Sequence, residues 1–245
     1  RVPQPVDQAG EETHNNTLDS MFKKLGESED NKFLVSHQNL ISKTKFFIFE
    51  NEKPGRAFIK EISPEKNQSE LNISVLNKHT IEKEIKNFLN PCLSGNDIAL
   101  ISDAGCPGIA DPGSEIVRLA HENKIKVIPL VGPSLILLAL MGSGMNGQSF
   151  KFNGYLPIEK NERKKKIKIL ENKSLITTQI FMETPYRNNK FLSTLLVTLR
   201  PETKLCIACD LTLSSEYIKT KEVKIWKSTK VDIHKRPTIF LIQSN

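Results

Sequence analysis

The sequence contains little of what marks secreted or membrane-spanning proteins. Its 245 residues include four cysteines (Cys92, Cys106, Cys206 and Cys209), too few and too scattered for a disulfide framework. The longest apolar run, at residues 135–141, is too short to cross a bilayer, and the N-terminus lacks the apolar core of a signal peptide. We therefore expect a cytoplasmic protein without membrane attachment.

Groups typical of a hydrolase, a metalloenzyme or a nucleotide-phosphate site are also missing. The five histidines are scattered and complete no Ser-His-Asp set, and neither a G-x-G-x-x-G pattern nor a G-x-x-x-x-G-K-[ST] loop occurs. Cys206 and Cys209 have the spacing of a zinc knuckle, but the surrounding apolar residues predict a buried strand, and no second pair completes the site. No metal site is predicted.

Positive charge, in contrast, is in excess. The formal net charge is +7 and the pI is near 9.1. This balance favours a polyanionic partner such as nucleic acid, although an AT-rich genome would also raise the lysine content. A basic run at residues 160–173 includes Lys164 and Lys165. It is either the solvated face of a helix or a set of phosphate contacts.

One stretch, residues 98–113, organises the chain. A short apolar run at residues 98–101 predicts a strand buried on both faces of a parallel sheet. Polar residues and a loop rich in glycine and proline follow at once, and glycine there permits a positive φ or close approach to a ligand. Asp111 and Pro112 then have the pattern of a helix N-cap and first helical residue.

A second unit of the same kind comes next. Residues 126–131 predict another strand, and a second glycine–proline break follows at residues 132–134. Open α/β sheets bind ligands at the carboxyl ends of their strands, where both loops are expected. The alternative is that both are ordinary tight turns. Further along, residues 223–226 and 238–242 are predicted as the last two strands.

Several motifs then occur in a fixed order. They are residues 102–107 (Ser-Asp-Ala-Gly-Cys-Pro), 111–113 (Asp-Pro-Gly), 129–134 (Pro-Leu-Val-Gly-Pro-Ser), 154–157 (Gly-Tyr-Leu-Pro), 183–187 (Glu-Thr-Pro-Tyr-Arg) and 210–212 (Asp-Leu-Thr). With Glu-Asn-Glu at residues 50–52, they resemble methyltransferases of the tetrapyrrole-methylase fold. Within that superfamily the similarity is to the ribosomal small-subunit RNA methyltransferase I group, and it runs from about residue 45 to residue 242.

The resemblance implies an α/β fold of two α/β domains with the cofactor S-adenosylmethionine in the cleft between them. We expect the N-terminal domain at residues 41–132 and the C-terminal domain at residues 133–245. Residues 1–40 predict a flexible or atypical segment. Family members open with an apolar strand and a Pro-x-Gly-like loop, which residues 1–5 do not match. Either truncation or replacement of that strand would leave the first sheet with an uncovered edge.

Residue by residue, the resemblance assigns a cofactor site and weaker substrate and catalytic sites. The cofactor residues are Ser102, Asp103, Ala104, Gly105, Pro107, Gly132, Pro133, Ser134, Glu183, Thr184, Pro185, Pro237 and Thr238. The substrate residues are Arg187, Lys164 and Lys165. The base that takes the proton of the acceptor is open among Asp103, Asp111 and Glu50.

Three functions fit these residues. The first is methylation of a ribose 2′-oxygen of small-subunit ribosomal RNA, with ribosomal RNA or the small subunit as partner and a homodimer as the assembly that the resemblance implies. The second is methylation of a small molecule such as a tetrapyrrole. The third is a degenerate binding protein without cofactor, which the unmatched first strand suggests.

Overall fold

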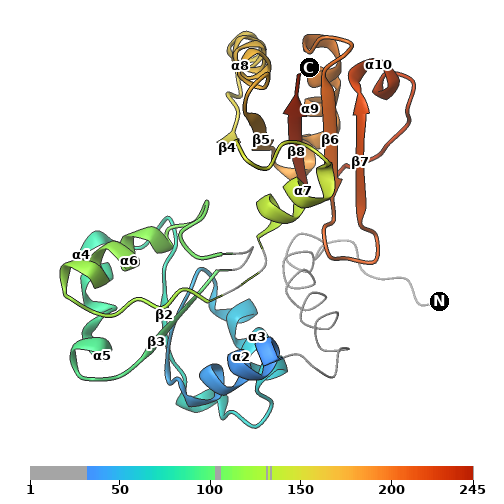
Figure 1. Ribbon diagram of the computed structural model, residues 1–245. Coiled ribbons are helices and arrows are strands. Elements are labelled where there is room, and N and C mark those ends of the chain that lie inside the picture. Colours follow the sequence, from blue (N-terminus) through green and yellow to red (C-terminus); the bar gives the residue numbers. More distant parts are fainter. Residues whose placement is uncertain (1–31, 103–105, 131, 133, 245) are drawn as a thin grey trace. The chain divides into compact units, whose positions relative to one another are not determined.

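The computed structural model describes residues 32–102, 106–130, 132 and 134–244. The chain divides between residues 133 and 134 into two compact units, here called the N-terminal and the C-terminal unit (Figure 1). Each unit contains its own sheet and its own helices. The predicted α/β class with two α/β parts is confirmed.

The N-terminal unit is built on a three-stranded parallel sheet with the order β2-β1-β3. Its strands are β1 (Phe46–Phe49), β2 (Asn72–Val75) and β3 (Ile98–Ile101). Its helices are α2 (Lys32–Lys43), α3 (Glu52–Ile62), η1 (Gln68–Glu70), α4 (Glu82–Asn87), α5 (Asn90–Leu93) and α6 (Gly113–Glu122). The last residues of the segment predicted to be atypical thus belong to helix α2.

Strand β1 is the centre of this unit because both its faces are covered. Phe47 and Phe49 pack with Ile59 of α3 on one face, while Ile48 packs with Ile116 of α6 on the other. Such alternation is what a continuous apolar strand needs in order to bury every side chain. Among the described strands, β3 lies at an edge of the sheet, and its four residues are only partly buried, less than the sequence predicted.

The predicted strand at residues 126–131 is wrong for the residues that the structure describes. Residues 126–130 have no regular secondary structure and pair with no strand of the described sheet, and residue 131 lies outside the described residues. Val127 reaches the core beside α6, whereas Ile128 and Leu130 are 65% and 52% exposed. An apolar run becomes a strand only where a neighbour pairs with it, and β3 pairs with β1 alone among the described strands.

The C-terminal unit contains a five-stranded mixed sheet with the order β4-β5-β8-β6-β7. Its strands are β4 (Phe150–Tyr155), β5 (Thr178–Met182), β6 (Lys204–Cys209), β7 (Tyr217–Glu222) and β8 (Thr238–Gln243). Its helices are α7 (Leu135–Ser143), α8 (Lys160–Lys173), η2 (Pro185–Arg187), α9 (Asn188–Thr198) and α10 (Val223–Trp226). Strand β8 runs antiparallel to β5 and β6, so β4, β5 and β6 all end at the same edge.

Helices cover both faces of this sheet. Figure 1 shows α7 and α9 on opposite faces. On the α9 face, the rings of Phe181, Phe191 and Phe240 are fully buried, and Phe191 meets Phe240 edge-on with centroids 5.1 Å apart. No helix in the described ranges is long and apolar enough to cross a membrane.

Residues 223–226 form helix α10, which corrects the prediction of a strand there. Trp226 fills the core on the α9 face, and its indole Nε1–H donates to the Leu205 carbonyl at 2.8 Å. The strand of this region is β7, which comes directly before α10. The sequence analysis did not predict it because Lys219 and Lys221 interrupt its apolar pattern. Charged residues are typical of edge strands, where they oppose pairing with other chains.

Candidate functional site

In the N-terminal unit, the two glycine–proline loops lie side by side. The Cys106 thiol of the first loop is 3.7 Å from the Gly132 carbonyl of the second, within hydrogen-bonding distance for sulfur. A Cβ on Gly132 would lie 4.0 Å from the Cys106 sulfur, the nearest atom among the described residues. The two loops therefore share one edge of the unit.

Asp111 shapes the first of these loops. Its Oδ1 accepts hydrogen bonds from the backbone N–H groups of Gly108 and Gly113, the latter at 2.8 Å. Gly108 has a φ of +80°, which favours glycine. A Cβ on Gly113 would lie 2.9 Å from the Gly108 nitrogen and 3.0 Å from Asp111 Oδ1. The Asp111 carboxylate thus has a structural task, which weakens it as a candidate base.

The remaining predicted residues of this unit have different surroundings. Ser102 directly follows β3 and is buried, whereas Pro107 is exposed. Glu50 is half-buried at the carboxyl end of the central strand β1. Asp103, Ala104, Gly105 and Pro133 lie outside the described residues.

Ser134 opens the C-terminal unit as the N-cap of α7. Its Oγ accepts from the Leu137 backbone N–H at 3.4 Å, and the residue is 7% exposed. A serine at this position satisfies an amide that the helix itself cannot. The predicted cofactor contact of Ser134 thus coincides with a helix start.

The predicted cofactor residues of the C-terminal unit lie together at one edge of its sheet. Met182 pairs with Ile239, and Cys209 pairs with Thr238. This register places Glu183, just after β5, opposite the start of β8, where Pro237 and Thr238 lie. Thr184 and Pro185 follow Glu183 at the start of η2, and both are half-buried. Strands of one sheet therefore bring five predicted cofactor residues together.

Glu183 is a buried carboxylate held by arginines. Its Oε1 accepts from Arg187 Nη2 at 2.7 Å and from the Thr184 backbone N–H at 2.8 Å. Arg163 of α8 approaches its other oxygen at 3.8 Å. A buried charge of this kind is retained only when it is paired and hydrogen-bonded. Arg187 is thereby fixed in place, with 37% of its side chain still exposed.

The predicted phosphate contacts lie on helix α8, which begins just after β4. Arg163 and Ile167 face the core, so the lysines of this helix occupy its remaining surface. Lys165 is exposed and Lys164 half-exposed. The structure is compatible with both predicted roles of the run, as a solvated face and as a basic surface.

Asp210, the residue after β6, belongs to one of the motifs of the sequence, but the sequence analysis assigned it no role in the site. It is 6% exposed, and its Oδ2 accepts from Arg236 Nε at 2.8 Å and from Ser215 Oγ at 2.8 Å. Its Oδ1 is buried with no hydrogen-bond partner within the described part of the chain. Its position after a buried strand and before Leu211-Thr212 was the available signal.

Cys206 and Cys209 lie in β6 but face opposite sides of the sheet, Cys206 towards α7 and Cys209 towards α9. This geometry prevents one ion from binding both thiols. Burial raises the pKa of each thiol to about 11. Across the described ranges, no group of three or more His, Cys, Asp or Glu residues is placed to hold a metal ion.

The chain was compared with known proteins and solved structures. No family model matches the chain. Ribosomal RNA small subunit methyltransferase I of Vibrio cholerae is 38% identical over 143 residues, covering 58% of this chain and 49% of that protein. The protein of the same name from Buchnera aphidicola subsp. Schizaphis graminum is 34% identical over 170 residues, covering 68% of this chain and 59% of its own length. The chain is similar to the ribosomal RNA small subunit methyltransferase I group.

The motif resemblance stated from the sequence is thereby confirmed. This chain spans only about half the length of the curated relatives that it matches. Among solved structures, the methyltransferase CobJ matches with a TM-score of 0.57, covering 89% of this chain and 87% of CobJ at 12% identity. At an identity this low, the structural match shows a similar fold and no more.

Proposed function

We propose that this chain belongs to an S-adenosylmethionine-dependent methyltransferase that modifies a ribose 2′-oxygen of small-subunit ribosomal RNA. The observation that carries the proposal is the joining of two glycine–proline loops through Cys106 and Gly132, in a chain whose similarity is to this group of proteins. The excess of positive charge supports an RNA substrate.

The first loop and Gly132 suit this cofactor because it has no phosphate to cradle. Backbone groups approached closely at glycine can meet its amino-acid and adenine ends, and we assign the contacts to residues 102–107 and 132–134. S-adenosylmethionine supplies the methyl group when bound. The contribution predicted for Glu183, Thr184, Pro185, Pro237 and Thr238 rests on the resemblance and stays a prediction.

The protein's own task in methyl transfer is alignment of the acceptor oxygen. Orientation alone can lower a barrier by about 7–11 kcal/mol in favourable cases, so few catalytic side chains are needed. A base must still take the ribose proton. Glu50 at the end of β1 and Asp103 remain candidates, whereas Asp111 already holds two loop amides. The homodimer and the cytoplasmic location stay predictions.

The test has two arms. Isothermal titration of the chain with S-adenosylmethionine should give saturable heat, and no heat at millimolar cofactor would favour the cofactor-free binding protein. Small ribosomal subunits lacking the modification should accept a labelled methyl group, which nucleoside analysis should locate on a ribose. Label transferred to a tetrapyrrole instead would establish the small-molecule alternative.

A further inference from the structure

Tyr186 stands out at the carboxyl edge of the C-terminal sheet. It lies in η2 directly after Pro185, and it is 65% exposed although it is a large aromatic residue. A single exposed apolar residue needs no explanation. Tyr186, however, has two exposed partners from a distant loop, His234 and Lys235, whose arrangement around the ring is specific.

The partners surround part of the tyrosine ring. Lys235 Nζ lies 5.5 Å from the ring centroid, at the distance of a cation–π contact. The His234 ring meets it edge-on, with centroids 6.3 Å apart and planes at 81°. With 65% of Tyr186 exposed, much of the residue is left for another flat group.

The loop at residues 232–236 is held firmly in this position. The Lys235 backbone N–H donates to the Pro185 carbonyl at 3.0 Å, which joins the loop to η2. The Ile233 backbone N–H donates to Asn189 Oδ1 at 3.0 Å, and Asn189 Nδ2 donates to Asp232 Oδ1 at 2.7 Å. These bonds order the loop from both sides before any ligand arrives.

Lys235 also has an unfavourable backbone conformation. Its φ is +57°, in the left-handed region that residues other than glycine, asparagine and aspartate rarely adopt. Such a conformation persists only where the surroundings impose it. Here Arg236 imposes it from the next position, since its guanidinium donates to Asp210 Oδ2 at 2.8 Å and to the Ser215 carbonyl at 2.8 Å.

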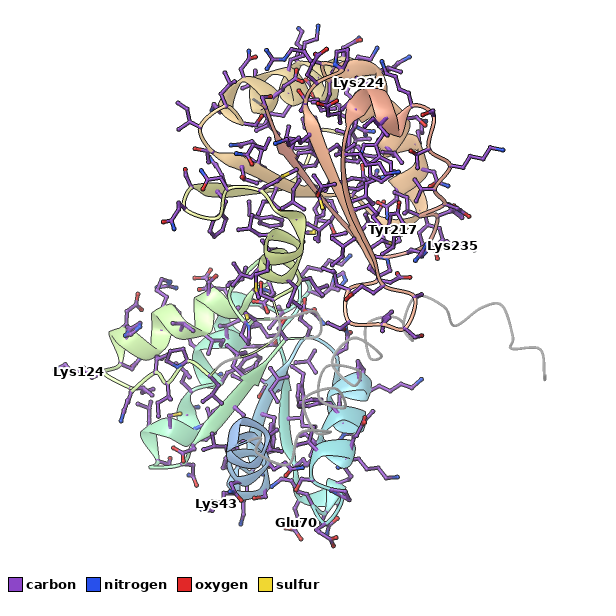
Figure 2. The ribbon with its side chains drawn as sticks, turned by 45° about the vertical axis from the view of Figure 1, so that its right-hand side comes forward. Lys43, Glu70, Lys124, Tyr217, Lys224 and Lys235 are labelled. Carbon is purple, nitrogen blue, oxygen red and sulfur yellow. The ribbon has the colours of Figure 1, made fainter. Side chains whose placement is uncertain are left out.

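An exposed aromatic ring beside an ammonium group suits a flat π-system that carries an anion. Unpaired nucleotides have this chemistry, and proteins bind them by stacking bases on aromatic side chains and placing cations against phosphates. Of the carboxylates around the platform, Glu183 and Asp210 are paired with Arg187 and Arg236, which offsets their repulsion of an anion, while the exposed Asp232 accepts from Asn189 Nδ2 and the His234 backbone N–H. Figure 2 shows Lys235 at the same end of the sheet as Tyr217 and far from Lys224.

We propose that Tyr186, His234 and Lys235 form a stacking platform for one base of single-stranded RNA, with the following phosphate against the Lys235 ammonium. The proposal deepens the proposed function and rests on it for the choice of RNA. The platform directly follows Glu183, Thr184 and Pro185, and helix α8 with its lysines begins at the same edge. It would hold the strand on which the modified nucleotide lies.

The test measures binding of a fluorescein-labelled 12-nucleotide oligoadenylate by fluorescence anisotropy. Tyr186→Ala should weaken binding about 5- to 100-fold, as expected for loss of one base–aromatic stack. Tyr186→Trp should bind at least as well as the wild type. The matched control Ile176→Ala, which truncates a 79% exposed apolar residue preceding β5, should leave binding unchanged.

Two further binding experiments distinguish the contribution of base stacking to RNA affinity from the contribution of charge. An RNA of the same length without bases should bind the wild type and Tyr186→Ala equally. Lys235→Gln should reduce the slope of log affinity against log salt concentration by about 0.7, the share of one phosphate contact on a single strand. The control Lys224→Gln, at the far end of the sheet beside Glu222, should leave that slope unchanged.

The outcomes distinguish this platform from the methyltransferase proposal. If the wild type binds oligoadenylate and Tyr186→Ala binds it equally well, the platform is overturned while the cofactor titration still decides the enzyme. If the wild type binds no RNA, the platform is likewise overturned. Loss of RNA binding in Tyr186→Ala, together with no heat from S-adenosylmethionine in the wild type, would keep the platform and reject the enzyme.

Discussion

The two units of this chain build a core in different ways. In the N-terminal unit, the most deeply buried large side chains are Phe47, Ile48 and Phe49 of one strand, together with Ile59 of α3. In the C-terminal unit, they come from three strands and three helices, among them Phe181, Phe191, Phe240 and Trp226. Each hydrophobic cluster of the described residues lies within one unit. A three-stranded sheet has one central strand and a five-stranded sheet has three, so more strands of the C-terminal unit can bury side chains on both faces.

The candidate site residues of the two units are also held in place by different interactions. At the C-terminal edge, buried carboxylates are fixed by arginines, as in the Glu183–Arg187 and Asp210–Arg236 pairs. At the N-terminal edge, the loops are shaped by glycines, by Asp111 and by the Cys106–Gly132 contact. Polar pairs give the C-terminal edge a fixed pattern of charge, whereas the N-terminal loops offer backbone groups.

The largest expected effect comes from truncating one core ring in each unit. Phe240→Ala should lower the free energy of unfolding of the C-terminal unit by about 3–5 kcal/mol, because the buried ring leaves a cavity. The single tryptophan, Trp226, reports on this unit, so its fluorescence in urea should show the change.

Phe47→Ala is the matched change in the N-terminal unit. It should shift a transition seen by circular dichroism and leave the midpoint of Trp226 fluorescence in place. If each variant shifted the circular dichroism transition and the Trp226 fluorescence midpoint together, the two units would unfold as one. That result would contradict the claim that each unit has its own core.

A smaller effect is expected from Gly113→Ala in the first loop. The new Cβ would press on the Gly108 nitrogen at 2.9 Å, which should cost about 1–3 kcal/mol and weaken binding of S-adenosylmethionine. Gly147→Ala is the control in the C-terminal unit, since no atom of the described residues lies within 4 Å of its added Cβ. Equal stability and equal cofactor affinity in the two variants would show that the loop does not depend on this close approach.

The smallest effect concerns the thiols, which divide evenly between the units. Cys92 and Cys106 are partly exposed, whereas Cys206 and Cys209 are buried, so a disulfide reagent at pH 8 should label two thiols in the native protein and four after denaturation. Mass spectrometry should assign the first two to Cys92 and Cys106. Rapid native labelling of Cys206 or Cys209 would contradict the packing of β6.

The same buried thiols predict a pH dependence. Their pKa is raised from 9.0 to about 11 by burial, so the folded state keeps protons that the unfolded state releases. Their contribution to the stability of the C-terminal unit should be constant below pH 9 and fall between about pH 9 and pH 11. Urea midpoints of Trp226 fluorescence across this range, compared with a Cys206→Ala, Cys209→Ala double variant, measure it.

The sequence predicted those parts of the fold that depend on local pattern. The apolar runs at β3, β6 and β8, and the helix after Asp111, are where the pattern places them. Residues 126–130 show what the pattern lacks: they are apolar, yet they form no strand because pairing depends on a neighbour far away in the sequence. Strand β7 was missed for the opposite reason, since its edge position allows alternating lysines.

For the candidate site, residue order predicted which loops matter but not what each side chain does there. The role of Asp111 depends on two amides close to it in space, and that of Glu183 depends on Arg163, 20 residues earlier. The platform of Tyr186, His234 and Lys235 joins residues almost 50 positions apart. Contacts across such separations arise from strand order, which no local pattern contains.

The most direct test of this account is a titration of the ¹⁵N-labelled chain with S-adenosylmethionine, followed by amide chemical shifts. We expect saturable shifts at Ser102, Cys106, Gly108 and Gly132, where the two loops meet. Shifts confined to other parts of the chain, or none at millimolar cofactor, would contradict the assignment of these loops to a methyl donor.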